Sequence, residues 1–470
     1  MNSRVKEFIK NFSMVIAGNI FSMLIAVTVT FLVPHFFSSE AYSYFQLENL
    51  YCGYIWIISL GWNDGLYVKF GGAKRSEIGC GKVSSQFMAL VIYLIASGCI
   101  IASIFSSRFE TSEKRFVFYM ALISVTVEIV TCSVTNLLQA TNSMKQYAKI
   151  TILDRGYYFC FVVMLLFLDI RDFYHLIAVD IISKCITLFI VLYSGRDFVF
   201  GKPQDIKQVL ADIKDILSIG INISMASYAS RMINNIVQLV IENMWGLLIF
   251  GKVALTLSIS NMFTKFVSAV SVVIFPVLRR AEGKSRENAY YVLNTFLMTV
   301  MLGIFCFYLP ARKLLELWLP EYKESLHYMA ILLPISLFET KTVMLVNTYL
   351  KIMRKEKEIL YCNLITVLLS IVLSFMGAVL FHNLIMTVSM IVVLLAFRCM
   401  LEEYRLSKYI SIPKNNCSEI IMCLTFIATS WGLKNFVGML LYLCVYAVYL
   451  YLSRDRIKDL YFYLKSLCGK

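Results

Sequence analysis

The sequence predicts an all-α polytopic membrane protein with about fourteen transmembrane helices. Of its 470 residues, 59% are hydrophobic and 16% are charged, whereas a soluble protein is usually about 25% charged. Apolar windows of about 20 residues, each long enough to cross a bilayer as a helix, recur from end to end. No long polar stretch interrupts them, which excludes a soluble domain held by a single membrane anchor.

The first apolar stretch follows "MNSRVKEFIK" and reaches Val33. It is too long for the apolar core of a signal peptide, so we expect an uncleaved first span. The approximate spans are 8–33, 42–65, 84–106, 116–138, 148–168, 173–195, 216–244, 247–277, 289–310, 326–350, 358–380, 384–402, 418–433 and 436–453.

The distribution of basic residues orients these spans. If the N-terminus is inside, the inside segments hold more than three times as many Lys and Arg residues as the outside loops. Short cytoplasmic loops are enriched in these residues, so both termini are expected in the cytoplasm. The net charge of +14 is spread over these short segments. It therefore gives no reason to expect a nucleic-acid partner.

Cysteine spacing and loop length limit the chemistry that we expect. The 13 cysteines are scattered and include no C-x-x-C pair, which favours neither a disulfide framework nor a zinc site. We expect no metal site and no cofactor. No loop is long enough for an extramembrane catalytic domain, so the chain is not expected to be an enzyme.

Two similar turns suggest an internal repeat. "LLQATNSMKQYAKI" joins spans four and five, and "YLKIMRKEKEILYC" joins spans ten and eleven. Aligned, they share Leu138 with Leu350 and Lys145 with Lys357. Six spans per repeat give two parallel repeats related by an axis along the membrane normal, with a central cavity between them. The expected division is a six-helix half at 1–200, a second at 201–410, and two additional helices with a cytoplasmic tail at 411–470.

The seventh span carries a polar stripe inside an apolar stretch. At about 100° per residue, seven of its polar side chains fall within an arc of about 100°: Ser224, Ser227, Arg231, Asn234, Asn235, Gln238 and Glu242. Arg231 lies near the middle of the span, where an arginine costs at least about 2.5–3.5 kcal/mol unless it faces water or a partner. Spans one, two and eight carry similar stripes. These stripes predict a hydrated, cationic, substrate-binding cavity, with the candidate residues Asn19, Gln46, Asn49, Arg231, Asn234, Asn235, Gln238, Asn261 and Lys265.

Other interpretations of these polar residues stay open. Asn and small residues also hold membrane helices together, so packing is as good an explanation for Asn19 and Gln46 as cavity lining. Asp180 and Lys184 are four residues apart and are expected to neutralise each other. The sequence does not decide whether the intramembrane acids Glu48, Glu128, Asp180 and Glu339 are functional or structural.

"LGWNDGLYVKFGG" (Leu60–Gly72), at the end of the second span, resembles the polysaccharide and O-antigen flippases. The span number, the two six-helix halves and "LLQATNSMKQYAKI" are similar to the same family. It belongs to the multidrug/oligosaccharidyl-lipid/polysaccharide (MOP) exporter superfamily. The resemblance implies a flippase that moves undecaprenyl-pyrophosphate-linked oligosaccharide, an O-antigen or capsule repeat unit, across the bacterial inner membrane by alternating access. It implies lipid-linked oligosaccharide and membrane lipids as partners. Further candidate partners are the polymerase and chain-length regulator of the same pathway.

Two alternatives remain at this stage. A cation-coupled drug antiporter of the same superfamily uses intramembrane acids, but the first span, Phe8–Val33, contains neither Asp nor Glu. A polysaccharide polymerase typically carries a large external loop, and the longest one expected here is short, Pro310–Ser325. The sugar unit, the energy source and the oligomeric state do not follow from the sequence.

Overall fold

The computed structural model of the protein describes residues 3–75, 78, 80–109, 111–201, 204–280, 284–412, 416–433 and 436–459. At positions 3–16, 80–82, 263, 265–280, 284–285 and 416–417 only the backbone is described. The described residues form helices joined by short connections and contain no strand. The predicted all-α polytopic membrane fold is therefore confirmed.

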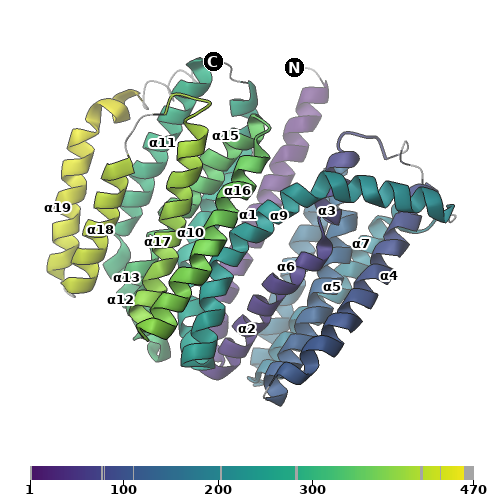
Figure 1. The fold of residues 1–470 in the computed structure, drawn as a ribbon, viewed down its shortest axis with the longest axis horizontal. Helices are drawn as coiled ribbons and strands as arrows, with labels where there is room; N and C mark the ends of the chain where they lie inside the picture. The colour runs from purple at the N-terminus through teal and green to yellow at the C-terminus, as the bar shows by residue number, and fades with distance from the viewer. Residues whose placement is uncertain are drawn as a thin grey trace. The chain divides into compact units, whose positions relative to one another are not determined.

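The chain divides into an N-terminal unit (Met1–Asn235) and a C-terminal unit (Ile236–Lys470). The boundary between them lies inside one long helix, α9, and not in a loop (Figure 1). The expected division at 1–200, 201–410 and 411–470 stays a prediction, and so does the central cavity.

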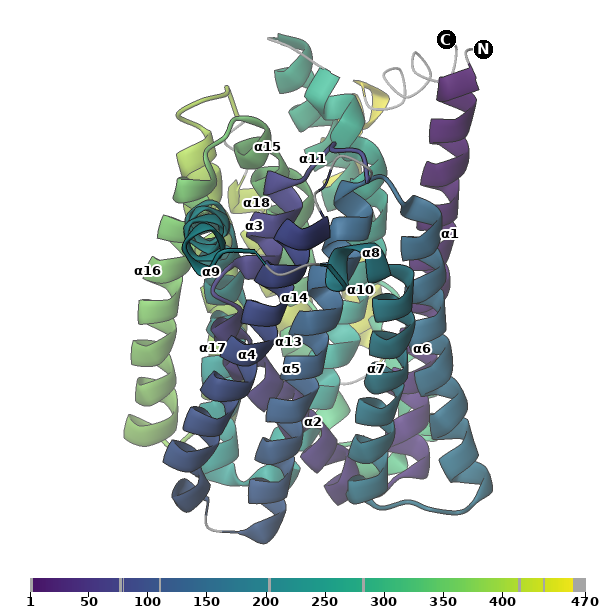
Figure 2. The ribbon, with the colours of Figure 1, turned by 90° about the vertical axis from the view of Figure 1, so that its right-hand side faces the viewer.

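In the N-terminal unit, α5 and α7 pack together, α6 packs against both α7 and α1, and α4 packs against α5. Figure 2 shows these helices side by side. The elements up to α9 are α1 (Ser3–Phe36), α2 (Ser39–Ile55), a 3-10 turn (Trp56–Ser59), α3 (Trp62–Lys69), α4 (Cys80–Phe105), a second 3-10 turn (Ser106–Arg108), α5 (Ser112–Ala140), α6 (Met144–Phe167), α7 (Phe173–Ser194), α8 (Arg196–Val199) and α9 (Ile206–Trp245).

In the C-terminal unit, α10 packs against α13 and α14, α17 packs against α13, α14 and α16, and α18 packs against α19. Its elements are α10 (Leu247–Arg280), α11 (Lys284–Phe305), α12 (Tyr308–Trp318), a 3-10 turn (Pro320–Tyr322), α13 (Ser325–Leu332), α14 (Ile335–Thr340), a π-helical segment (Lys341–Val346), α15 (Asn347–Ile352), α16 (Glu356–Phe375), a second π-helical segment (Met376–Leu380), α17 (Leu384–Leu406), α18 (Asn416–Gly432) and α19 (Phe436–Leu452).

Each of the fourteen predicted spans corresponds to a helix or to a broken helix. Among the described residues, 8 helices are long and apolar enough to cross a membrane, and the bent pair Ser325–Leu332 and Ile335–Ile352 gives a ninth span. Shorter apolar helices occupy Leu247–Met262, Ser418–Gly432 and Phe436–Leu452. The two remaining predicted spans, α2 with α3 and α9, are among those that carry polar stripes. The expected external loop Pro310–Ser325 is mostly helical, because α12 fills it.

The two turns that suggested a repeat have the same backbone. Asn142 and Arg354, which align with each other, both adopt the left-handed conformation, with φ of 58° and 56°. The next amide in each turn donates to a matching carbonyl, from Ser143 to Leu138 and from Lys355 to Leu350, each at 2.8 Å. Both turns therefore end their helix with the same left-handed capping motif, which supports the internal repeat.

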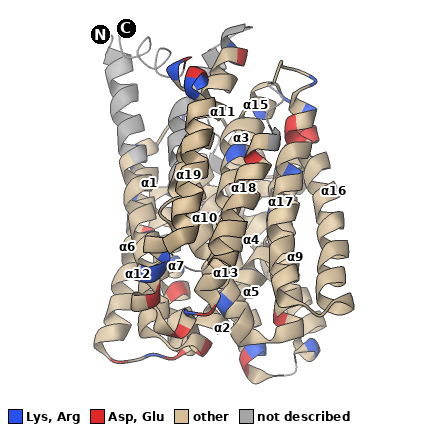
Figure 3. Ribbon diagram, turned by 90° about the vertical axis from the view of Figure 1, so that its left-hand side faces the viewer, with Lys and Arg blue, Asp and Glu red and all other residues tan. Residues whose placement is uncertain are grey.

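Charged residues lie mainly toward the helix ends, as Figure 3 shows. One of them, Arg75, joins three predicted cytoplasmic connections of the N-terminal unit. Its guanidinium donates to Gln146 Oε1 at 3.0 Å and to the Ser194 carbonyl at 2.8 Å, and it lies 2.9 Å from Asp197 Oδ2. These connections therefore lie on one side of the unit, as alternating spans require.

Candidate functional site

The second span is broken in its middle. After α2 ends at Ile55, Trp56–Ser59 form a 3-10 turn, and then Leu60 and Gly61 take left-handed φ values of 47° and 85°. Glycine adopts this conformation without strain because it has no Cβ, whereas leucine rarely does. The break turns the backbone between α2 and α3.

The first part of α9 runs antiparallel to this broken span. Successive residues of α9 therefore contact progressively earlier residues of the span. Lys69 forms an ion pair with Asp212 at 3.3 Å at one end. Further along, Ser224 donates to Asp64, and the Tyr228 hydroxyl donates to the Tyr54 carbonyl at 3.1 Å. The helix follows the break closely as a result.

Glycines allow the two segments to meet backbone to backbone. A Cβ built on Gly220 of α9 would lie 1.9 Å from the Gly61 carbonyl oxygen, and one built on Gly65 would lie 2.1 Å from the Ile216 carbonyl oxygen. No side chain fits at such separations. The glycines of "GWNDG" are therefore explained by a close helix contact, as in other small-residue interfaces of membrane helices.

A cavity of about 230 Å³ lies at this break. Arg231 lines it, and its guanidinium carbon lies 5.7 Å from the centroid of the Trp56 ring. That distance allows a cation–π contact. The cavity is lined by Trp56, Ile57, Ser59, Leu60, Gly61, Asn63, Asp64, Cys132, Asn136, Ser224, Met225, Ser227, Tyr228 and Arg231.

A larger cavity of about 300 Å³ lies among helices of the same unit. Trp56 and Cys132 line both cavities, so the two are neighbours. Its lining combines hydroxyl, carboxylate and basic side chains: Ser22, Trp56, Glu128, Thr131, Cys132, Thr135, Tyr147, Ile150, Thr151, Asp154, Arg155, Tyr158, Asp180, Ser183, Lys184 and Thr187.

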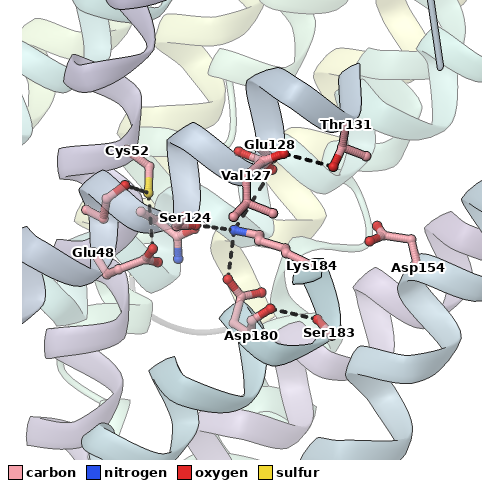
Figure 4. A network of polar contacts seen from close by, with 12 residues as sticks. Glu48, Cys52, Ser124, Val127, Glu128, Thr131, Asp154, Asp180, Ser183 and Lys184 are labelled. Atoms are coloured by element: carbon pink, nitrogen blue, oxygen red, sulfur yellow. Dashed lines mark hydrogen bonds and ion pairs between the residues drawn. The ribbon is translucent and has the colours of Figure 1, made fainter. Parts of the chain in front are cut away.

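Lys184 lines the larger cavity, and Figure 4 shows its contacts with acidic and hydroxyl side chains. Its Nζ lies 2.7 Å from Asp180 Oδ2 and 3.9 Å from Glu128 Oε1, and it donates to Ser124 Oγ at 2.6 Å. The expected pairing of Asp180 with Lys184 is confirmed. Buried Glu48 is drawn beside this group in Figure 4, and the Cys52 thiol donates to its Oε1 at 3.1 Å.

Among the nine predicted cavity residues, Arg231 lines a cavity of the N-terminal unit. Gln46 and Asn49 bond along α2, where the Asn49 amide donates to Gln46 Oε1 at 3.4 Å and the Gln46 amide donates to the Tyr42 hydroxyl at 2.5 Å. A Cβ built on Gly53 would lie only 2.5 Å from the amide nitrogen of Asn235, so Asn235 packs closely against Gly53 of α2.

The five other candidates are divided between the two units. Asn19 and Asn234 in the N-terminal unit, and Gln238 and Asn261 in the C-terminal unit, are half-buried. Lys265 lies on α10, but its side chain lies outside the described residues. A single cavity shared by all nine stays a prediction.

Polar stripes on three helices of the sequence indicate the larger cavity. Three helices carry polar residues at intervals of three and four: Glu128, Thr131 and Thr135 on α5; Tyr147, Thr151, Asp154 and Tyr158 on α6; and Asp180, Ser183, Lys184 and Thr187 on α7. This spacing places each set on one face of its helix. The same periodicity argument that was applied to span seven would have found these three stripes.

The C-terminal unit contains a buried network of charges. Lys341 Nζ lies 2.7 Å from Glu403 Oε2 and 2.9 Å from Glu419 Oε2, and its side chain is 1% exposed. Nearby, Arg398 lies 2.9 Å from Glu339 Oε2. Glu339, which the sequence left unassigned, therefore belongs to an ion pair inside the unit. Glu419 lies on α18, so its ion pair links α18 to the π-helical segment that begins at Lys341.

Neither a family model nor a curated protein matches the sequence. Solved structures are similar in fold. The lipid II flippase MurJ, in an inward closed conformation, matches with a TM-score of 0.68 at 12% identity, over 96% of this chain and 100% of that chain.

Two other solved structures come from transporters of the MOP superfamily. An inward-facing multidrug resistance transporter of the MATE family matches with a TM-score of 0.59 at 13% identity, over 88% of this chain and 96% of that chain. A MOP superfamily transporter from Pyrococcus furiosus, with a binding pocket of reverse polarity, matches with a TM-score of 0.54 at 13% identity, over 85% of this chain and 96% of that chain. The chain thus shares the fold of these membrane transporters.

Proposed function

We propose that this protein is a transporter that moves a lipid-linked oligosaccharide, with an undecaprenyl pyrophosphate carrier, across the bacterial inner membrane. The observation that carries the proposal is the position of Arg231. It is an exposed guanidinium in a polar cavity at the break of a membrane span. The similarity in fold to a lipid II flippase adds support.

The chemistry of such a substrate fits this position. Sugar hydroxyls lose hydrogen bonds to water in hydrocarbon, so the head needs a polar path while the lipid tail stays in the bilayer. An arginine binds a phosphate with two parallel hydrogen bonds. Outward movement of the negatively charged pyrophosphate follows the membrane potential, which contributes about 2.3 kcal/mol per charge per 100 mV.

A cation-coupled drug antiporter is the second candidate, and one observation favours it. The larger cavity is lined by three carboxylates, Glu128, Asp154 and Asp180, against two cationic residues, Arg155 and Lys184. Acids in a hydrated intramembrane cavity suit cationic substrates and proton relays. The similarity to multidrug transporters is compatible with this candidate.

Export assays in a deletion strain distinguish the two candidates. For the flippase, deletion should abolish surface polysaccharide and cause lipid-linked repeat units to accumulate, while drug sensitivity stays unchanged. Normal polysaccharide with increased drug sensitivity would favour the antiporter.

Complementation with Arg231 variants tests the role of the guanidinium. Arg231→Ala should reach the wild-type membrane level and lose export. Arg231→Lys should retain part of the activity, because it keeps the charge but loses the paired hydrogen-bond geometry. Full export by Arg231→Ala at the wild-type level would rule out this arginine as a substrate contact.

A further inference from the structure

We propose that the larger cavity of the N-terminal unit is a sugar subsite. In this view it holds the hexose attached to the pyrophosphate, and Trp56 is the platform on which that sugar stacks. The inference rests on the proposed flippase function and deepens it, because it assigns the two parts of the head group to two neighbouring cavities.

The size and lining of the larger cavity suit a single sugar ring. Its volume of about 300 Å³ is at the lower end of the range for small-molecule sites. Carboxylates accept hydrogen bonds, and hydroxyl side chains both donate and accept them, which matches the hydroxyls around a hexose. The cavity provides Asp154, Thr131, Thr135 and Thr151 on α5 and α6 alone.

Trp56 provides the apolar surface that a sugar ring needs. The C–H groups on one face of a hexose pack well against an aromatic ring. Trp56 lines both cavities, and its ring is the one that the Arg231 guanidinium approaches. A phosphate held at Arg231 would therefore place the attached sugar beside Trp56, as the covalent link between phosphate and sugar requires.

The charge of the cavity narrows the sugar class. Its three carboxylates outnumber its two cationic residues, and Figure 4 shows the buried carboxyl group of Glu48 beside the same group of charges. A carboxylate on the sugar would be repelled by this lining. We therefore infer a neutral or N-acetylated hexose at this position, and not a hexuronic acid.

Binding to the full-length protein in nanodiscs tests the subsite with three probes. They are farnesyl pyrophosphate, farnesyl pyrophosphate that carries N-acetylglucosamine on its terminal phosphate, and farnesyl pyrophosphate that carries glucuronic acid at the same position. The wild type should bind the N-acetylglucosamine probe about tenfold more tightly than farnesyl pyrophosphate. The glucuronic acid probe should show no such gain.

Variants identify the groups responsible for the gain. Trp56→Ala should reduce the ratio of the two affinities to about one, whereas Trp56→Phe should keep most of the ratio. Thr135 lines the larger cavity and not the smaller one, so Thr135→Leu, which narrows the larger cavity, should also remove the gain. Trp431→Ala is the matched control, because Trp431 stacks on His327 in the C-terminal unit, and it should keep the ratio.

Each other outcome has a defined meaning. Wild-type binding of farnesyl pyrophosphate without any gain from the sugar overturns the subsite and leaves the flippase proposal intact. Wild-type binding of none of the probes overturns the flippase proposal, and the subsite with it. An unchanged ratio in both Trp56→Ala and Thr135→Leu assigns the sugar to another part of the protein and overturns the subsite.

Discussion

Arg231 and Lys341 are both basic residues near the middle of membrane spans, and their surroundings are opposite. Arg231 is exposed in a cavity and approaches an aromatic ring. Lys341 is buried, and its Nζ donates to Glu403 Oε2 at 2.7 Å and to both carboxylate oxygens of Glu419 at 3.0 and 2.9 Å. Removal of Arg231 should therefore affect transport, whereas removal of Lys341 should affect folding.

Lys341→Met should destabilise the protein severely. It leaves the buried carboxylates of Glu403 and Glu419 without their cation, and loss of one partner of a buried pair typically costs about 3–5 kcal/mol. We expect a clear fall in the thermal midpoint of the purified protein, measured by fluorescence in detergent. The triple variant Lys341→Met/Glu403→Gln/Glu419→Gln should recover much of the loss.

Lys252 provides the control for this prediction. Its Nζ lies 3.9 Å from Glu324 Oε2, whose side chain is 90% exposed. Such a pair contributes about 0–1 kcal/mol, so Lys252→Met should leave the midpoint nearly unchanged. If the Lys341→Met protein had the wild-type thermal midpoint, the ion pairs of Lys341 with Glu403 and Glu419 would not stabilise the C-terminal unit.

At the scale of helices, the contact between α3 and the first part of α9 depends on glycine. The backbones of Gly61 and Gly220 touch, so even one methyl group at position 220 would overlap the carbonyl oxygen of residue 61. The broken span and α9 must then separate or shift, and the smaller cavity between them changes shape with that shift.

Gly220→Ala should lower both the membrane level and the thermal midpoint. Gly156→Ala on α6 is the matched control, because a Cβ there meets nothing within 4 Å, and alanine favours a helix by about 1 kcal/mol over glycine. Equal midpoints for the two variants would mean that the Gly61–Gly220 contact is not close in the folded protein.

The helices follow from composition, but the break in the second span does not. Apolar windows predict spans because a bilayer requires every backbone group to bond within its own helix. The break at Trp56–Gly61 contains no proline, and the left-handed Leu60 has no local explanation in the sequence. The break depends on how α9 packs against it, and the sequence pattern of a single span contains no information on that packing. Arg231 was found because its stripe is strong, whereas the weaker stripes of α5, α6 and α7 consist largely of hydroxyls, which helices tolerate for many reasons.

At the scale of the whole molecule, the alternation of spans determines which loops face the cytoplasm. The contacts of Arg75 place three connections of the N-terminal unit on one side. The loop between α6 and α7, which contains Asp169, is predicted to lie on the other side. The excess of basic residues predicts that the Arg75 side faces the cytoplasm.

Single cysteines on a cysteine-free background test this orientation. Lys74 and Asp169 are both exposed, so a cysteine at either position should react readily. In intact cells an impermeant maleimide should label a cysteine at position 169 and not one at position 74. After permeabilisation it should label both. Labelling of position 74 in intact cells would invert the orientation.

The continuity of α9 has a consequence for the order in which the protein is made. The N-terminal unit includes residues up to Asn235, beyond the first six spans. While only those six have left the ribosome, Gly61 and Gly65 have no α9 backbone to meet. The unit can reach its final packing only after the seventh span has entered the membrane. A nascent chain truncated near residue 200 should therefore remain open to membrane chaperones and proteases, and one extended through Trp245 should be protected.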